Sequence, residues 1–193
     1  MLLRISIPSR LAAVIAAALL VAAPVARAVP ADDLREAQKL FGQGKSQPAL
    51  DKVEVFLKAQ PKDPQGRLLK GVLLTELKRD ADALQVFTSL TEDFPELPEP
   101  YNNMAVLYAQ QGNYEKAMTA LELTIHTHPS YAMAHENLGD VYAQLAGRSY
   151  ERVLQLDKNN AAAKAKTALI KDVLGAGKSA GARGATGASP AKP

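Results

Sequence analysis

The 193-residue sequence contains no cysteine and no tryptophan. Without cysteine, the chain cannot form a disulfide, a thiolate zinc site, a cysteine nucleophile or an acylated lipoprotein cysteine. Aromatic residues account for only 5% of the chain, whereas hydrophobic residues account for 47%. Because alanine and medium-sized aliphatic side chains must build the core, the composition suits close-packed helices better than a β-sandwich.

The basic charge of the chain is confined to its two ends. The net charge is +3, but residues 1–28 and residues 176–193 each contain three Lys or Arg and no acid. Subtracting two contributions of +3 from the total leaves −3 for residues 29–175. A mildly acidic folded part lacks the basic face that nucleic-acid binding requires, so we expect no nucleic-acid partner.

Residues 1–28 have the three parts of a secretory signal peptide. A basic start is followed by 13 apolar residues from Leu11 to Ala23 and by a small-x-small site at residues 26–28. This apolar run is short for a membrane-spanning helix, and Pro24 follows it. We therefore expect cleavage after Ala28, rather than an uncleaved anchor. The expected location is periplasmic or secreted, without stable membrane insertion after cleavage.

Several residue series recur in the middle of the chain with a step of 34 residues. They are Pro61, Pro95 and Pro129; Ala49, Ala83 and Ala117; and Ala37, Gly71, Ala105 and Gly139. Small side chains allow antiparallel helices to approach closely, and proline stops a helix and directs the next one. Gly44 and Gly112 lie two steps apart, with Lys78 between them, and glycine suits the positive φ of a tight turn.

This helix–turn–helix period resembles that of the tetratricopeptide-repeat (TPR) family. The clearest copy, residues 98–131, fills the signature places with Tyr101, Met104, Ala105, Tyr108, Gly112, Tyr114, Ala117 and Pro129. Residues 30–63 and 64–97 match less completely. The resemblance implies an all-α fold, a right-handed solenoid of helical hairpins over residues 29–174.

The fourth copy, residues 132–160, lacks about five residues, including the usual turn. One outcome is a single long helix with a soft point at Gly147, and the other is a pinched turn there. The helical spacing of the apolar residues on both sides of the deletion favours the long helix. We expect residues 161–174 to form a capping helix and the Gly/Ala/Lys-rich residues 175–193 to form a disordered tail.

Motifs for catalysis and cofactor binding are incomplete. The GKS sequence at residues 44–46 lacks the first glycine of a phosphate-binding loop, and His135-Glu136 lacks the second histidine of a zinc-protease helix. His126, His128 and His135 lie within ten residues. A metal site or pH sensor is therefore an alternative to structural roles at a helix end and at an aromatic repeat position. We expect no catalytic residues, no metal site, no cofactor and no enzymatic activity.

The resemblance implies that the first helices of successive repeats line a concave groove that binds extended peptides or helices. Carried over position by position, the groove residues are Leu68, Val72, Asn102, Asn103, Val106, Ala109, Gln110, Glu136, Asn137, Asp140 and Gln144. Asn103 and Asn137 occupy matching places, and their amides either bond a peptide backbone or tie neighbouring helices together. The basic clamp of chaperone-binding members is missing, which argues against a ligand held by its C-terminal carboxylate.

These observations predict a non-catalytic adaptor or scaffold in the bacterial periplasm. It would bind peptide segments or helices of envelope or secretory proteins in the concave groove. An apolar second repeat and an acidic fourth repeat favour a peptide with an apolar part and a basic part. The alternative is a self-assembling oligomerisation module that joins copies of the same chain, since a fold alone does not fix a function.

Overall fold

The computed structural model describes residues 31–184, with side chains described for residues 33–175. This part of the chain folds into eight α-helices and contains no strand. The helices are α1 (Ala31–Gly42), α2 (Ser46–Ala59), α3 (Pro64–Glu76), α4 (Asp80–Asp93), α5 (Pro98–Gln110), α6 (Tyr114–Thr127), α7 (Ala132–Leu156) and α8 (Ala161–Gly184). The predicted signal peptide lies outside the described residues.

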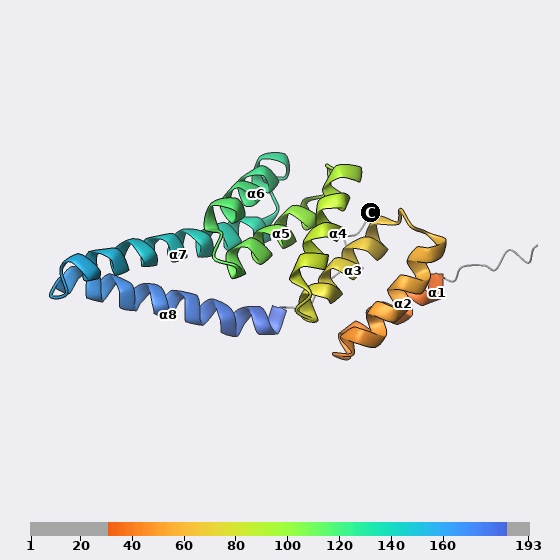
Figure 1. The fold of residues 1–193 in the computed structure, drawn as a ribbon, viewed down its shortest axis with the longest axis horizontal. Helices are drawn as coiled ribbons and strands as arrows, with labels where there is room; N and C mark the ends of the chain where they lie inside the picture. The colour runs from red at the N-terminus through yellow and green to blue at the C-terminus, as the bar shows by residue number, and fades with distance from the viewer. Residues whose placement is uncertain (1–30, 185–193) are drawn as a thin grey trace, which may run out of the picture.

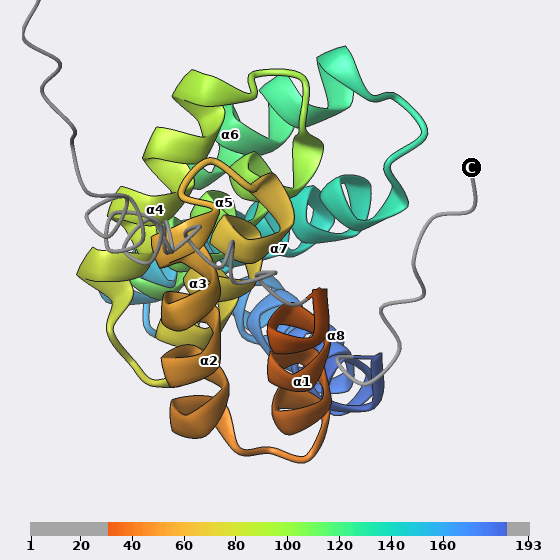
Figure 2. The same cartoon turned by 90° about the vertical axis from the view of Figure 1, so that its right-hand side faces the viewer.

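The first six helices form three consecutive antiparallel hairpins, α1–α2, α3–α4 and α5–α6, which stack in chain order (Figure 1). Each hairpin corresponds to one predicted 34-residue copy, so the predicted all-α solenoid is confirmed. The helices that open the hairpins lie on one side of the stack, and the helices that close them lie on the other (Figure 2). Helix α8 runs along the side of the opening helices.

The local sequence explains where these helices begin and end. The Asp63 carboxylate accepts a 2.7 Å hydrogen bond from the backbone N–H of Gly66, and Pro64 occupies the first turn of α3. Both features stabilise a helix N-terminus. The turns within the hairpins have positive φ at Gly44 (73°), Lys78 (61°) and Gly112 (76°). The predicted turn series therefore has one non-glycine member.

Small residues at the predicted contacts allow the two helices of a hairpin to approach closely. A Cβ atom added to Gly71 would overlap the aromatic ring of Phe87, which is fully buried. One core cluster joins α1 to α5 through side chains such as Leu50, Leu73 and Leu90. A second cluster joins α5, α6 and α7 and contains Leu121. The stack is therefore held by interlocking contacts between neighbouring hairpins.

Helix α7 is one continuous helix of 25 residues, so no turn interrupts it at Gly147. This is the favoured outcome for the shortened fourth copy. Just beyond Gly147, the Arg148 guanidinium donates a 3.1 Å hydrogen bond to the carbonyl oxygen of Gly112 and lies 4.2 Å from the centre of the Tyr114 ring. These contacts fix the direction in which α7 leaves the stack.

Helix α8 folds back antiparallel to α7, and the two form a long hairpin that projects from the stack (Figure 1). The predicted capping helix exists, but it continues ten residues beyond its predicted end at residue 174 and reaches Gly184. Alanine and lysine favour the first part of the helix, whereas each of the four glycines in its last ten residues disfavours it by about 1 kcal/mol relative to alanine. Residues 185–193 of the predicted tail lie outside the described residues. None of the helices in residues 31–184 combines the length and apolar character needed to cross a membrane.

Candidate functional site: a cavity between α5, α7 and α8

A cavity of about 500 Å³ lies where α5, α6, α7 and the facing residue of α8 meet. Helix α8 contributes one residue, Leu174, to its lining. Six of the eleven residues predicted to form the groove line it: Val106, Ala109, Gln110, Asn137, Asp140 and Gln144. The spacing of three or four residues on each helix places these side chains on one face. The structure therefore brings together six of the nine residues predicted for the groove in the third and fourth repeats.

The cavity has an apolar wall and a polar edge. Ala105, Leu121, Val141 and Leu174 contribute apolar surface, and the amides of Gln110, Asn137 and Gln144 contribute hydrogen-bonding groups. Asp140 is the only carboxylate among the described lining residues, and no lysine or arginine lines this cavity. A pocket of this volume, with apolar walls and a few polar groups, can take apolar side chains of a bound peptide or helix. The single negative charge favours a neighbouring cation in the ligand.

Two asparagines join neighbouring repeats at one edge of the cavity. The Asn137 amide nitrogen donates a 2.8 Å hydrogen bond to the side-chain oxygen of Asn102, which is only 3% exposed. Asn103 instead donates to the backbone oxygen of Glu99 in its own helix. Asn137 therefore ties α7 to α5, as one alternative held, but its partner is Asn102. Because Asn102 is buried, it positions Asn137 and presents little surface to a ligand.

The other predicted groove residues do not meet in this cavity. Leu68 and Val72 on α3 are half-buried against the N-terminal core cluster. Glu136 is exposed on α7, outside the cavity lining. The predicted groove is thus divided into an apolar surface on α3 and a separate cavity beside α7.

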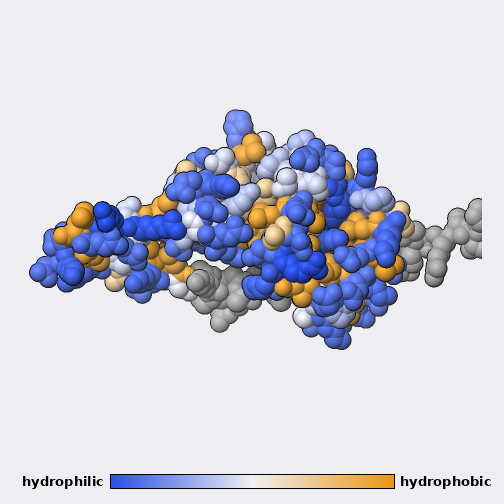
Figure 3. Space-filling model, in the orientation of Figure 1, coloured by the Kyte–Doolittle hydropathy of each residue, from blue (hydrophilic) through white to orange (hydrophobic). Residues whose placement is uncertain are grey.

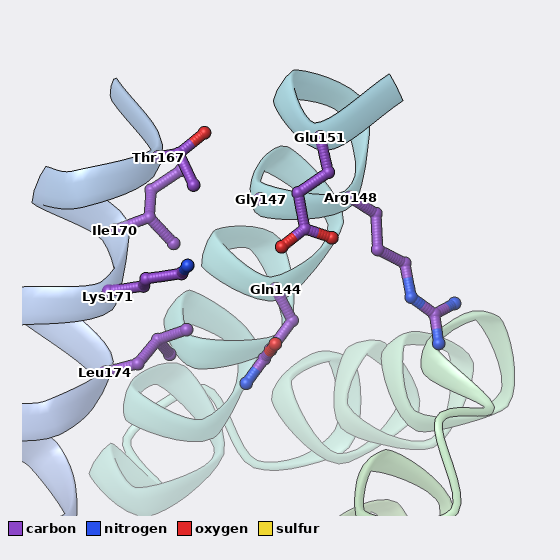
Figure 4. Close-up of a pocket in the computed structure, with 8 residues that line it drawn as sticks. All are labelled: Gln144, Gly147, Arg148, Glu151, Thr167, Ile170, Lys171 and Leu174. Carbon is purple, nitrogen blue, oxygen red and sulfur yellow. The ribbon is translucent and has the colours of Figure 1, made fainter. Parts of the chain in front are cut away.

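The sequence prediction missed the part that α8 plays. Leu174 of α8 lines the cavity, and a second, smaller cavity of about 120 Å³ lies between α7 and α8. Gln144 and Leu174 border both cavities, and Lys171 extends from α8 toward α7 (Figure 4). The spacing of Thr167, Ile170 and Leu174 indicates one helix face. That pattern predicted a packed helix, but not a wall of the groove.

The three histidines are not assembled into a site. One ring nitrogen of His135 lies 2.9 Å from the carbonyl oxygen of Pro129, and one of His128 lies 3.0 Å from the Thr127 hydroxyl. Among the described residues, no group of three or more His, Asp or Glu side chains is placed to hold a metal ion. The ring contacts are those of residues beside a helix end.

Two family models, both described as tetratricopeptide repeat, match residues 34–98 and residues 74–138. Curated relatives carry the same repeat. A chloroplastic TPR domain-containing protein, PYG7 of Arabidopsis thaliana, is 32% identical over 85 residues, which is 42% of this chain and 28% of that protein. Human tetratricopeptide repeat protein 16 is 26% identical over 73% of this chain and 18% of its own length. This chain thus spans less than a third of either relative.

Solved structures share the fold at low sequence identity. A thermophilic TPR protein of Thermus thermophilus has a TM-score of 0.57 at 23% identity, covering 75% of this chain and 82% of its own. The first TPR domain of Spaghetti (RPAP3), bound to an HSP90 peptide, has a TM-score of 0.56 at 20% identity, covering 60% of this chain and 91% of its own. The helical hairpins, their 34-residue period and these matches agree, and the chain belongs to the tetratricopeptide-repeat family.

Proposed function

We propose that this protein is a non-catalytic adaptor that binds a peptide segment or helix of another protein through the cavity between α5, α7 and α8. The observation that carries the proposal is the lining of that cavity. Apolar walls, three amides and one carboxylate converge there from successive repeats. The ligand we favour carries a small apolar side chain next to a lysine or arginine. The apolar side chain packs against the apolar wall of the cavity, and the cation faces Asp140.

A TPR domain of similar fold, from Spaghetti (RPAP3), is bound to an HSP90 peptide. That likeness supports a peptide as the class of partner, but the ligand chemistry here should differ. No lysine or arginine among the residues with described side chains lines the cavity, so these residues offer no cation to a C-terminal carboxylate. The signal-peptide pattern of residues 1–28 supports export, and we propose envelope or secretory proteins in the periplasm as the source of partners.

The proposal is tested by selecting peptides from a random displayed library on the purified protein. We expect enrichment of peptides in which an apolar residue neighbours Lys or Arg. Binding of a selected peptide should fall at least tenfold with Val106→Glu and with Asp140→Lys, measured by fluorescence anisotropy. Circular dichroism checks that both variants stay helical.

Leu123→Glu provides the matched control, because Leu123 is 43% exposed on α6 and does not line the cavity. This variant should bind the peptide as the unchanged protein does. Failure to enrich any peptide, or equal loss with Leu123→Glu, would contradict the proposed site.

Export has its own test. When the full chain is produced in a bacterium, the periplasmic fraction should contain a protein whose first residue is Val29. Protein that retains Met1 and stays in the membrane fraction would favour the uncleaved anchor.

A further inference from the structure

The fourth repeat has its second helix fused to its first, so its two halves cannot fold against each other. Phe87, Leu121 and Tyr150 each lie 11 residues before the first residue of the next opening helix, α5, α7 and α8. Tyr150 thus takes the place of Phe87 and Leu121. Gly139 takes the place of Gly71 and Ala105 by the 34-residue step.

In a complete repeat, these two places touch. A Cβ on Gly71 would overlap the Phe87 ring, whereas a Cβ on Gly139 would meet nothing within 4 Å. Tyr150 cannot cover Gly139 in the same chain, because both belong to one straight helix. Eleven residues at 1.5 Å per residue separate them by roughly 16 Å along the axis. Gly139 is therefore a contact site whose own partner is out of reach.

Around Gly139, one side of α7 carries residues, such as Tyr142, whose counterparts are buried in the complete second repeat. Tyr142 is 49% exposed, whereas its counterpart Leu74 in α3 is 1% exposed. Ala143, Ala146, Tyr150 and Val153 continue the same side of α7 and are half-buried. The residues of α7 that border the α8 side, such as Gln144 and Gly147, lie on a different side. Helix α8 reaches the edge of this face through Lys166, whose ammonium nitrogen lies 5.0 Å from the centre of the Tyr150 ring, and it leaves Gly139 and Tyr142 exposed.

The projecting hairpin also lacks a core of its own. From residue 142 to residue 175, the only buried side chains are those of Ala163 and Thr167. Hydrophobic residues show at its surface among hydrophilic ones (Figure 3). Leu156 and Leu169 are 75% and 64% exposed. Two helices without a third packing partner bury too little apolar surface to be stable alone. Packing against a partner would bury the exposed apolar side chains of this hairpin and stabilise it.

We propose that a second copy of this chain covers this face, with Tyr150 of each copy packed on Gly139 of the other. The two α7 helices run antiparallel across a two-fold axis, and the small residues Ala143 and Ala146 lie where they cross. The partner is a second copy because the other chain carries the half-repeat that each chain lacks. Its Tyr150 can pack on Gly139 in the way that Phe87 packs on Gly71. One symmetry operation satisfies both sites, and a shortened hinge favours such an exchange. This surface lies away from the peptide cavity, so the inference does not depend on the proposed function.

The absence of cysteine permits a direct test with single-cysteine variants of the full chain. Gly139→Cys and Tyr150→Cys are purified separately, mixed and oxidised, and the products are separated without reductant. We expect a mixed disulfide between the two variants and little homodisulfide of either, since residue 139 of one copy meets residue 150 of the other and neither residue meets its own counterpart across the axis. Gln155→Cys is exposed on another side of α7 and serves as the matched control. It should form no disulfide with Gly139→Cys.

A second variant restores the missing turn. The five residues Gly-Asn-Tyr-Glu-Lys, which stand at positions 112–116 of the third repeat, are inserted between Leu145 and Ala146. Tyr150 then reaches Gly139 of its own chain. Sedimentation equilibrium should show a dimer for the unchanged protein and a monomer, half that mass, for the insertion variant.

The proposal is overturned if the unchanged protein is monomeric, or if the mixed disulfide is absent while the control pair crosslinks. Equal dimerisation of a helical insertion variant would also overturn it. If the insertion variant does not fold, as judged by circular dichroism, the mixed disulfide decides the question.

Discussion

The Asn137 amide on α7 and the buried side-chain oxygen of Asn102 on α5 are 2.8 Å apart and form a hydrogen bond between two repeats. The bond satisfies a polar atom that water cannot reach, because Asn102 is 3% exposed. It also sets the position of α7 along the edge of the cavity. This single contact links the stability of the stack to the geometry of the candidate site.

Removing the Asn137 amide should destabilise the fold. Asn137→Ala leaves the Asn102 oxygen buried without its donor, which costs about 1–3 kcal/mol of unfolding free energy. Asn103→Ala is the control, since Asn103 bonds only a backbone oxygen of its own helix. Urea unfolding followed by circular dichroism should show a clear loss of unfolding free energy for Asn137→Ala and a much smaller loss for Asn103→Ala. Equal losses would mean that the inter-repeat bond contributes little.

Gly71 and Gly139 should respond oppositely to alanine. Gly71→Ala forces a methyl group into the Phe87 ring and should cost about 1–3 kcal/mol. Gly139→Ala meets no neighbour in one chain and should stabilise α7 by about 0.5–1 kcal/mol at dilutions where the protein is monomeric. Chemical denaturation of both variants at low protein concentration measures the difference. A stabilising Gly71→Ala would show that the α3–α4 contact is looser than described.

The turn between α3 and α4 is a site for stabilisation. Lys78 has φ of 61°, where the equivalent turns have Gly44 and Gly112. A residue with a Cβ is disfavoured there by about 1 kcal/mol relative to glycine. Lys78→Gly should therefore raise the melting temperature, and Gly112→Ala should lower it. Scanning calorimetry compares the two variants with the unchanged protein. A lower melting temperature for Lys78→Gly would show that the positive φ of Lys78 does not strain the backbone.

The Arg148 side chain should hold α7 in its direction. Arg148→Ala loses the hydrogen bond to the Gly112 oxygen and the contact with the Tyr114 ring, with an expected cost of about 1 kcal/mol. Arg152→Ala is the control, because Arg152 bonds only to Gln155 of the same helix. Hydrogen exchange should accelerate at the α5–α6 turn in the first variant alone. Unchanged hydrogen exchange at the α5–α6 turn would show that Arg148 does not anchor α7.

Tyr131 should titrate above its ordinary pKa. Burial, and secondly the negative charge of Glu99, raise the pKa of Tyr131 above 10.0. Because the raised pKa belongs to the folded state, the folded chain holds this proton more tightly than the unfolded chain. The contribution to stability is present below pH 10 and is lost as the pH rises through the folded pKa. Ultraviolet titration of the protein and of Tyr131→Phe should show one high-pH tyrosine transition missing in the variant.

Much of this fold is determined by the sequence alone. The 34-residue series depend on steric requirements that are local to each hairpin: small residues such as Gly71 where helices touch, and glycine at positive φ in the turns. Such requirements recur with the repeat, so the period predicted the hairpins. The family resemblance, and not the period, implied which face of the opening helices lines a groove. The deletion was visible in the same way, and the unbroken helical spacing favoured a continuous α7.

Only the tertiary structure decided which of the predicted groove residues lie together. Whether Asn102 or Asn103 meets Asn137 depends on the rotation of α5 against α7, and no spacing within one helix records that rotation. The return of α8 along α7, which brings Leu174 to the cavity, depends on long-range packing as well. The open face around Gly139 arises from the same cause, because losing a turn separates two halves that the sequence still encodes as partners.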